Sequence, residues 1–205
     1  MKVLLINGSP RATGCTFTAL NEVAKTLNEN DIETEIIQVG HKEYSGCLSC
    51  YSCYKTRQCV IDDEVNEIAS RFLEYSGIVI GSPVYYAAPS GALLSFLNRL
   101  FYRGGTDKTM IVGAAVVSAR RAGCTATFDV LNKYFTISGM PVVSSQYWNM
   151  VHGSEAEEVL EDLEGLQTMR VLARNMAFLM KSIKLGKETY GLPEKEKRVF
   201  TNFTR

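Results

Sequence analysis

The segment KVLLINGSPRATGCT, residues 2–16, decides the fold that we expect of this chain. It starts with a short apolar run, breaks at Asn7-Gly8, and continues through a loop rich in glycine and hydroxyl side chains. A strand that is apolar on consecutive residues is typically buried on both faces, as in the middle of a parallel sheet. We therefore predict a strand over 2–7, a tight turn, and a helix over about 15–29.

Further apolar runs repeat this pattern, and amphipathic segments separate them. We predict strands over 33–39, 77–82, 109–118 and 140–148. We predict helices over 63–75, 89–102, 122–138 and 155–183. Strict alternation predicts an open, doubly wound α/β sheet, with the strand order 2-1-3-4-5. This gives one domain over 1–185 and a tail over 186–205, whose large apolar side chains suggest an arm packed on a second subunit; a frayed end is the alternative.

The bulk composition excludes several classes of protein. Lys and Arg total 22 and Asp and Glu total 22, so no net charge favours nucleic acid or an anionic membrane as a partner. The apolar run at the N-terminus is too short for a signal peptide, and no stretch approaches the roughly 18 apolar residues that span a bilayer. We expect a cytoplasmic protein, in which clustered cysteines are metal ligands or redox groups rather than structural disulfides.

The loop after the first strand has the chemistry of a phosphate site. It offers two glycines, three hydroxyl groups and one cation: Gly8, Gly14, Ser9, Thr13, Thr16 and Arg11. The start of the following helix adds free amides and a positive dipole end. The loop matches neither G-x-x-x-x-G-K-[ST] nor G-x-G-x-x-G, which disfavours nucleoside triphosphates and dinucleotides. A single terminal phosphate, as in FMN, remains; a capped turn that binds nothing fits equally well.

Two later loops are expected at the same edge of the sheet. GSPVYYAAP (81–89) follows the third strand, and SARRAG (118–123) follows the fourth. In the strand order 2-1-3-4-5 the ends of strands 1, 3 and 4 adjoin, so the three loops converge on one crevice. Tyr85 and Tyr86 would offer planar surfaces to an aromatic ring. Packing in the core or at an interface is the alternative for both.

Three motifs in order carry a resemblance to a known family: INGSPRATGCT, CLSCYSCYKTRQCVIDDEVNEI and GSPVYYAAPSGALLSFLNR. Over about residues 1–150 the chain resembles the flavodoxin-like NADPH-dependent FMN reductase superfamily, and more closely its iron–sulfur flavoprotein branch. The resemblance implies a flavodoxin-like three-layer α/β/α sandwich with a five-stranded parallel sheet. It implies FMN as cofactor, with the phosphate at Ser9, Arg11, Gly14, Cys15 and Thr16. It implies the flavin ring at Pro83, Val84, Tyr85 and Tyr86, and it implies further cofactor-binding residues, Arg120 and Gly123, in the loop after the fourth strand.

The segment CLSCYSCYKTRQC, residues 47–59, holds four of the six cysteines in the pattern C-x2-C-x2-C-x5-C. Zinc sites usually join two C-x2-C pairs across a longer insert, and bacterial ferredoxins use C-x2-C-x2-C-x3-C-P. The resemblance implies a 4Fe–4S cluster on Cys47, Cys50, Cys53 and Cys59. Zinc, a disulfide switch and a loop of plain thiols are the alternatives. The acidic pair Asp62-Asp63 after this segment is expected to cap the next helix.

The function that we expect is an FMN-dependent oxidoreductase of the flavin or quinone reductase type. The family resemblance implies NAD(P)H as hydride donor, or a ferredoxin-like protein as electron donor if the cluster is present. The acceptor would be a small molecule or a protein. A non-catalytic FMN-binding electron carrier or regulator is the alternative. The apolar helix over 89–102 and the tail predict a homodimer or homotetramer.

Overall fold

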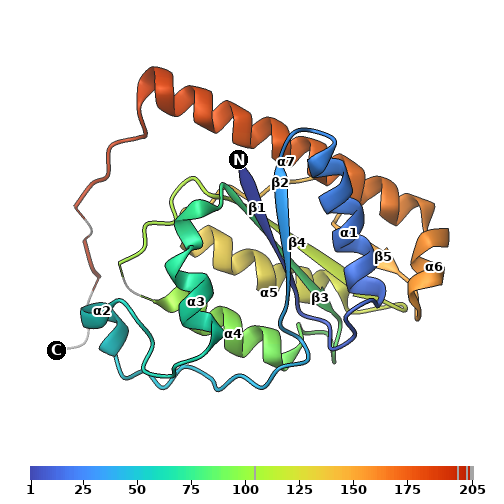
Figure 1. Cartoon of the computed structure of the whole chain (residues 1–205), viewed down its shortest axis with the longest axis horizontal. Helices are drawn as coiled ribbons and strands as arrows, with labels where there is room; N and C mark the ends of the chain where they lie inside the picture. The colour runs from blue at the N-terminus through green and yellow to red at the C-terminus, as the bar shows by residue number, and fades with distance from the viewer. Residues whose placement is uncertain (104, 198, 202, 204–205) are drawn as a thin grey trace.

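The computed structural model describes residues 1–103, 105–197, 199–201 and 203, and it has the expected fold (Figure 1). One parallel sheet has the strand order β2-β1-β3-β4-β5. Its strands are β1 (Lys2–Asn7), β2 (Glu33–Gln38), β3 (Gly77–Pro83), β4 (Val112–Ala119) and β5 (Met150–His152). The flavodoxin-like architecture predicted from the sequence is therefore confirmed.

Helices cover both faces of the sheet (Figure 1). They are α1 (Cys15–Asn28), α2 (Ser52–Thr56), α3 (Glu64–Ser70), α4 (Gly91–Tyr102), α5 (Cys124–Ile137), α6 (Ala156–Glu161) and α7 (Leu163–Tyr190), with a 3₁₀ turn over Phe72–Glu74. Side chains of β1 alternate between the two layers, because successive strand residues point to opposite faces. Val3 and Leu5 pack with α1, α6 and α7, whereas Leu4 and Ile6 pack with α3, α4 and α5.

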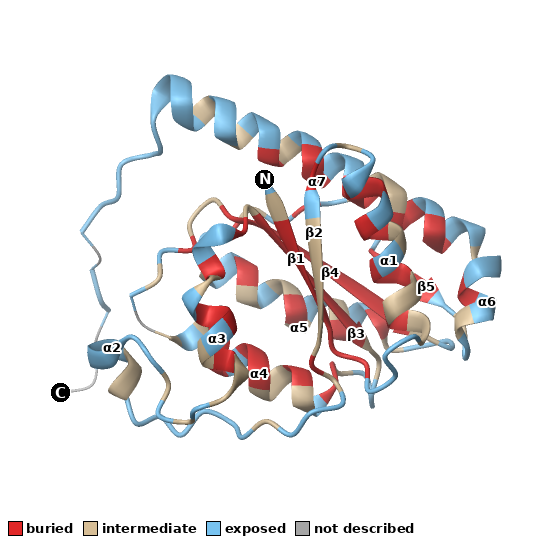
Figure 2. Ribbon diagram, in the orientation of Figure 1, coloured by how far each residue is buried: buried red, intermediate tan, exposed pale blue. Residues whose placement is uncertain are grey.

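The central strands are buried and the edge strand β2 is not (Figure 2). Every residue of β3 and β4 is buried except the last, whereas β2 has no fully buried residue. Consecutive apolar residues in the sequence therefore mark the strands with helices on both faces, as expected for a parallel sheet. Among the helices of the described ranges, none is long and apolar enough to cross a bilayer.

The strand predicted over 140–148 is wrong. Only Val142 pairs with β4, through an isolated bridge to Gly113, and β5 begins at Met150. Between them the chain leaves the sheet, and the buried Asn149 side chain donates to Ala115 O at 3.0 Å. This amide takes a β4 carbonyl that a regular edge strand would use. The ladder resumes only where β5 pairs with Val117 to Ala119.

Two predicted helices are also interrupted. The helix expected over 155–183 is two helices, because Asp162 accepts a hydrogen bond from Gly165 N at 2.9 Å and caps a new helix start. The second, α7, continues to Tyr190, past the domain boundary expected at 185. The helix expected over 63–75 ends at Ser70 and is followed by the 3₁₀ turn.

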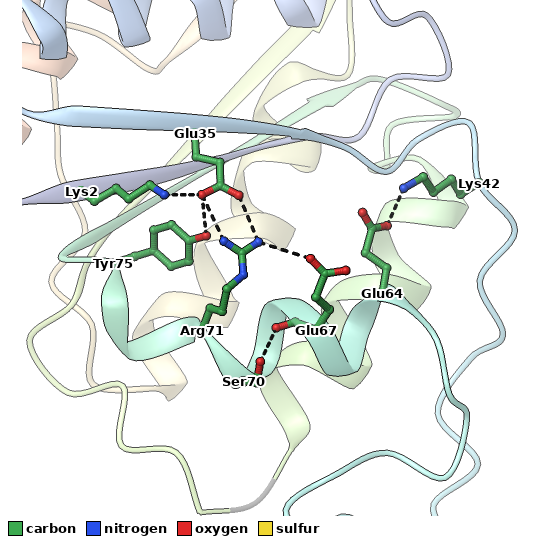
Figure 3. Close-up of polar contacts among 8 residues, drawn as sticks. All are labelled: Lys2, Glu35, Lys42, Glu64, Glu67, Ser70, Arg71 and Tyr75. Atoms are coloured by element: carbon green, nitrogen blue, oxygen red, sulfur yellow. Dashed lines mark hydrogen bonds and ion pairs between the residues drawn. The ribbon is translucent and has the colours of Figure 1, made fainter.

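A polar cluster around Glu35 joins the end of α3 to the sheet (Figure 3). The Glu35 carboxylate accepts hydrogen bonds from Lys2 at 2.5 Å, Tyr75 at 2.9 Å and Arg71 at 3.1 Å. Burial alone would raise the pKa of Glu35, but these three donors outweigh it and hold the pKa at about 2. The cluster therefore stabilises the ionised carboxylate and ties α3 to β1 and β2.

Candidate functional site

The three predicted loops meet at the carboxyl edge of the sheet and enclose a cavity of about 230 Å³. Eight predicted site residues line it: Ser9, Arg11, Cys15, Thr16, Pro83, Val84, Tyr85 and Arg120. Five lining residues were not predicted: Pro10, Ser118, Ala119, Gly153 and Ser154. Two of these follow β5, and the misplaced fifth strand explains why the sequence did not reveal them. Gly14, Tyr86 and Gly123 do not line this cavity.

The backbone of the first loop is held from both neighbouring strands. Gly8 N donates to Gly81 O at 2.8 Å, and the Ser90 hydroxyl donates to Gly8 O at 2.6 Å. On the other side Gln38 donates to Ser9 O at 2.5 Å. A Cβ atom at Gly40 would lie 2.3 Å from Gly8 O, so glycine is required at this close approach. The loop is therefore preorganised before any ligand enters.

The N-terminus of α1 faces this loop without a side-chain cap. Its N-cap residue is Gly14, and the first intrahelical bond is from Thr18 N to Gly14 O at 3.0 Å. The amides of the preceding first turn have no intrahelical acceptor and carry the positive end of the helix dipole. The buried Thr16 hydroxyl is fixed at 2.8 Å from the Ser118 hydroxyl. Free amides beside a cavity are a fitting site for a phosphate group.

Arg11 spans the mouth of the cavity. Its guanidinium donates to the Glu155 carboxylate at 3.0 Å and to Ser154 O at 3.3 Å. Both side chains are exposed, and exposed ion pairs contribute at most about 1 kcal/mol. A phosphate in the cavity can therefore compete with Glu155 for the Arg11 guanidinium.

Cys15 lies inside the cavity wall. Its thiol donates to Gly153 O at 3.4 Å and joins the helix start to the end of β5. Burial raises the pKa of the Cys15 thiol, and the nearby Glu155 charge acts in the same direction. Cys15 is therefore a neutral thiol that supports the wall, not a thiolate nucleophile.

The second loop forms a tight hairpin. Tyr85 and Ala88 exchange backbone hydrogen bonds of 2.9 and 3.0 Å, and the two residues at the tip, Tyr86 and Ala87, have φ of 49° and 58°. Left-handed backbone at two non-glycine residues is strained, and such strain collects at functional sites. Tyr85 lines the cavity, whereas the Tyr86 side chain is fully exposed at the tip.

The third loop packs against this hairpin and forms a second hollow of about 470 Å³ with it. Gly123 has φ of +88°, and a Cβ atom there would lie 2.8 Å from Val84. Its role is thus to let the two loops touch. Tyr86 lies in the second hollow with the exposed Arg120 and Arg121. In the described part of the chain neither arginine has an acidic partner, so the hollow is cationic.

The four clustered cysteines line one pocket at the C-terminal end of α4, together with residues from that end of the helix. All four are free thiols, and Cys47 and Cys50 are exposed. The loop is sharply folded, with left-handed backbone at Ser49, Tyr51 and Arg57. No three Cys, His, Asp or Glu groups among the described residues are placed to hold a single metal ion.

Sequence reasoning missed the buried cation in this pocket, Arg99 of α4. Its guanidinium donates to the Asp63 carboxylate at 2.6 and 2.8 Å and to Cys59 Sγ at 3.3 Å. Burial alone would lower the pKa of Arg99, but the hydrogen bonds to Asp63 and Cys59 outweigh it and the pKa is raised. Asp63 also caps α3, accepting from Val65 N at 3.0 Å, so the predicted cap is confirmed.

Among the described residues the four thiols border one pocket without any three of them converging on a single metal ion. In a 4Fe–4S cluster each thiolate binds a different iron, so the four sulfurs need not converge on one point. Here all four thiols border the same pocket, and the buried guanidinium of Arg99 donates a hydrogen bond to one of them.

A parallel sheet of this order, with an open helix start and three loops at its carboxyl edge, defines a flavodoxin-like nucleotide-binding protein. Within that class the chain belongs to the family of NADPH-dependent FMN reductases, whose model matches residues 1–155. It is accordingly a flavoprotein that uses FMN for oxidoreductase chemistry.

Curated relatives match over most of this chain. An iron–sulfur flavoprotein of Methanocaldococcus jannaschii is 34% identical over 192 residues, covering 90% of this chain and 100% of the relative. An iron–sulfur flavoprotein of Methanosarcina thermophila is 27% identical over 193 residues, covering 92% and 100%. These relatives bear the name of the branch that the sequence motifs resemble.

Solved structures support the same fold. RosB, solved with bound 8-demethyl-8-formylriboflavin-5′-phosphate, superposes with a TM-score of 0.71 at 15% identity, covering 100% of this chain and 92% of RosB. An archaeal flavodoxin superposes with a TM-score of 0.60 at 15% identity, covering 88% and 99%. At this identity the likeness establishes the flavodoxin-like fold alone.

Proposed function

We propose that this protein is an FMN oxidoreductase that exchanges electrons between its flavin and a 4Fe–4S cluster on Cys47, Cys50, Cys53 and Cys59. The observation that carries the proposal is the arrangement of four free thiols around one pocket at the C-terminal end of α4. The N-terminal end of the same helix is bonded to the phosphate loop through Ser90. The names of the curated relatives support the same assignment.

In this proposal FMN supplies hydride and single-electron transfer when bound, and the protein supplies position and electrostatics. The uncapped start of α1 and Arg11 hold the phosphate. Tyr85 and the hairpin backbone flank the flavin ring. No acid or base of the protein is required in the cavity, in keeping with the neutral thiol of Cys15.

We further propose that a reduced nicotinamide dinucleotide phosphate is the donor. The family name supports this choice. The cationic hollow supports it too, since Arg120 and Arg121 lie there beside the exposed ring of Tyr86. Guanidinium groups bind phosphates bidentately, and an exposed aromatic ring can stack on a planar base.

A single spectroscopic experiment tests the donor. Under anaerobic conditions NADPH is expected to bleach the flavin absorbance. Bleaching by a reduced ferredoxin-like protein, with none by NADPH or NADH, would instead make the protein an electron carrier without nicotinamide chemistry.

Metal analysis tests the cluster. Protein produced or reconstituted without oxygen is expected to hold about four irons and four sulfides per chain, with broad absorbance beyond the flavin bands. Cys50→Ser should lose the iron and keep FMN, because the phosphate loop is a separate element. Cys124→Ser is the matched control, since Cys124 is buried in α5 outside the cysteine loop. Iron-free wild-type protein after anaerobic reconstitution would reject the cluster and leave an ordinary flavin reductase.

We also propose that the protein assembles as a homodimer or homotetramer. Large apolar side chains are exposed on α7 and after it, including Phe178, Leu185, Tyr190, Val199 and Phe203. The segment after α7 contacts the rest of the protein through an ion pair between Lys195 and Asp107. Light scattering at micromolar concentration is expected to give a mass above that of the monomer, and a monomer mass would contradict assembly.

A further inference from the structure

We propose that Arg99 is a positioning residue that sets the reduction potential of the cluster, through a hydrogen bond from its buried guanidinium to Cys59. The inference rests on the proposed function, because it concerns the group that the four cysteines would hold. The inference concerns the reduction potential of the cluster, whereas the proposed function concerns its binding, and the thiols could bind iron with or without this hydrogen bond.

The side chain of Arg99 uses all three guanidinium nitrogens. Nη1 donates to Asp63 Oδ2 at 2.6 Å, and Nη2 donates to Asp63 Oδ1 at 2.8 Å and to Ile61 O at 2.9 Å. Nε remains for Cys59 Sγ, at 3.3 Å. The side chain is only 1% exposed, so these bonds form where water does not compete. Burial of a cation is unfavourable unless partners satisfy it, and here every partner lies between Cys59 and Asp63.

Cys59 is held more firmly than the other three cysteines. Its backbone N donates to Asn66 Oδ1 at 2.8 Å, and its carbonyl accepts from Asn66 Nδ2 at 3.0 Å. Because its sulfur also accepts a hydrogen bond from Arg99, Cys59 is held by both α3 and α4. Within the described ranges no hydrogen bond reaches the sulfurs of Cys47, Cys50 or Cys53. Cys59 is therefore the fixed ligand, and the other three belong to a loop that can adjust to it.

The hydrogen bond, rather than the charge of Arg99, should dominate the effect. Asp63 forms a bidentate pair with the guanidinium and neutralises most of its field at a distance. The Nε–H group still points directly at the sulfur. Hydrogen bonds to cluster sulfurs favour the reduced, more negatively charged form and so raise the reduction potential. Reduction adds one electron to the cluster and breaks no bond to the protein.

Arg99→Lys is the decisive variant, because lysine keeps the charge and cannot place donors on Asp63, Ile61 and Cys59 together. We expect it to keep about four irons per chain and to show a more negative cluster potential in an anaerobic redox titration followed by visible and electron paramagnetic resonance spectra. The flavin potential, read in the same titration, should stay unchanged. Arg103→Lys is the matched control: Arg103 borders the same pocket but donates from Nε to Arg57 O, so its cluster potential should equal that of the wild type.

Asp63→Asn measures the charge of the ion pair separately from the hydrogen bond to Cys59. Asparagine can still cap α3, but Arg99 loses the anion that neutralises it, so the cluster potential should become more positive. Equal potentials in wild type, Arg99→Lys and Arg103→Lys, each with four irons, would overturn this inference and leave the proposed function intact. If Arg99→Lys loses iron, the double variant Arg99→Met/Asp63→Asn decides, because it removes the guanidinium and its countercharge together and takes away the donor to Cys59 at unchanged net charge; a cluster potential equal to that of the wild type there overturns the inference. Wild-type protein that binds no iron after reconstitution would overturn both proposals.

Discussion

The two ends of α4 support two candidate sites that are built in different ways. At the N-terminal end, Ser90 bonds to Gly8 and the cavity is formed by loops that each follow their own strand. At the C-terminal end, side chains of Arg99, Asp63 and Asn66 hold one side of the cysteine loop. Topology makes the first site and a few buried polar contacts make the second. A substitution that damages one site should therefore leave the other intact, although α4 is only about 18 Å long at ~1.5 Å per residue.

The largest effect is expected from Gly40→Ala, which should weaken FMN binding at the N-terminal end of α4 (the flavin end) and leave the cysteine loop unchanged. A Cβ atom at this position would lie 2.3 Å from the backbone of Gly8 and Ser9, so the loop must shift. We expect FMN to bind about a hundredfold more weakly, which corresponds to about 2.8 kcal/mol. Flavin fluorescence titration measures the loss, and iron content should be unchanged.

Gly91→Ala is the control for this variant. Gly91 is the first residue of α4, beside the same loop, and a Cβ atom there meets nothing within 4 Å. It should bind FMN as the wild type does. If Gly40→Ala binds FMN normally, the close approach of residue 40 does not shape the phosphate loop. If it also loses iron, the two ends are not independent.

The loops at the N-terminal end of α4 could be predicted because each of them directly follows its own strand. Consecutive apolar residues gave β1, β3 and β4, and glycine with hydroxyl residues marked the turn after β1. The cavity wall after β5 was missed because Asn149 replaces part of the β4 ladder by a side-chain contact. No periodic pattern encodes such a contact.

The support of the cysteine loop was not predictable in the same way. Arg99 stands in the last turn of an apolar helix, where a cation is ordinarily exposed and favoured by the helix dipole. Its burial depends on contacts with Cys59, Ile61 and Asp63, which lie 36 to 40 positions earlier. The spacing of the cysteines showed that they belong together, but it could not show which of them is fixed.

The second prediction concerns acid stability on the side of the molecule that carries the cysteine loop. Glu35 has its pKa lowered from 4.5 to about 2, so its contribution is complete above pH 4.5 and is lost as the pH falls to about 2. The full shift would correspond to about 3.4 kcal/mol, and partial exposure reduces this to about 2 kcal/mol. Glu35→Gln should lower the free energy of unfolding at pH 7 by that amount.

The pH profile distinguishes this effect from a general loss of packing. Between pH 4.5 and 2, stability of the wild type should fall more steeply than that of Glu35→Gln. Glu33→Gln is the control, because Glu33 is an exposed residue of the same strand. Chemical unfolding across this pH range measures both slopes, and parallel profiles would show that the cluster around Glu35 does not contribute as its geometry implies.

The third prediction concerns Arg11 at the mouth of the flavin cavity. Arg11→Ala should weaken FMN binding about tenfold, because a charge-assisted hydrogen bond contributes about 1.5 kcal/mol or more. Glu155→Gln removes the competing carboxylate at 3.0 Å and should leave FMN binding equal or tighter. Titrations at moderate salt compare the two variants. Equal weakening by both would mean that Arg11 acts by joining the loop to Glu155 and not by contact with the phosphate.

The smallest effect is expected at a position remote from both sites, and it tests whether stability and binding can be separated. Gly186 lies inside α7, and a Cβ atom there meets nothing within 4 Å. Alanine is favoured over glycine in a helix interior where its Cβ meets no neighbour, so Gly186→Ala should raise the free energy of unfolding by about 0.5–1 kcal/mol. Thermal and denaturant unfolding measure the gain, while FMN affinity and iron content should match the wild type. A change in FMN affinity or in iron content would mean that the C-terminal part of α7 influences the two sites. An increase in global stability alone should leave both quantities unchanged, because the loops are already formed in the folded protein. No gain in stability would show that this part of α7 is not helical in solution.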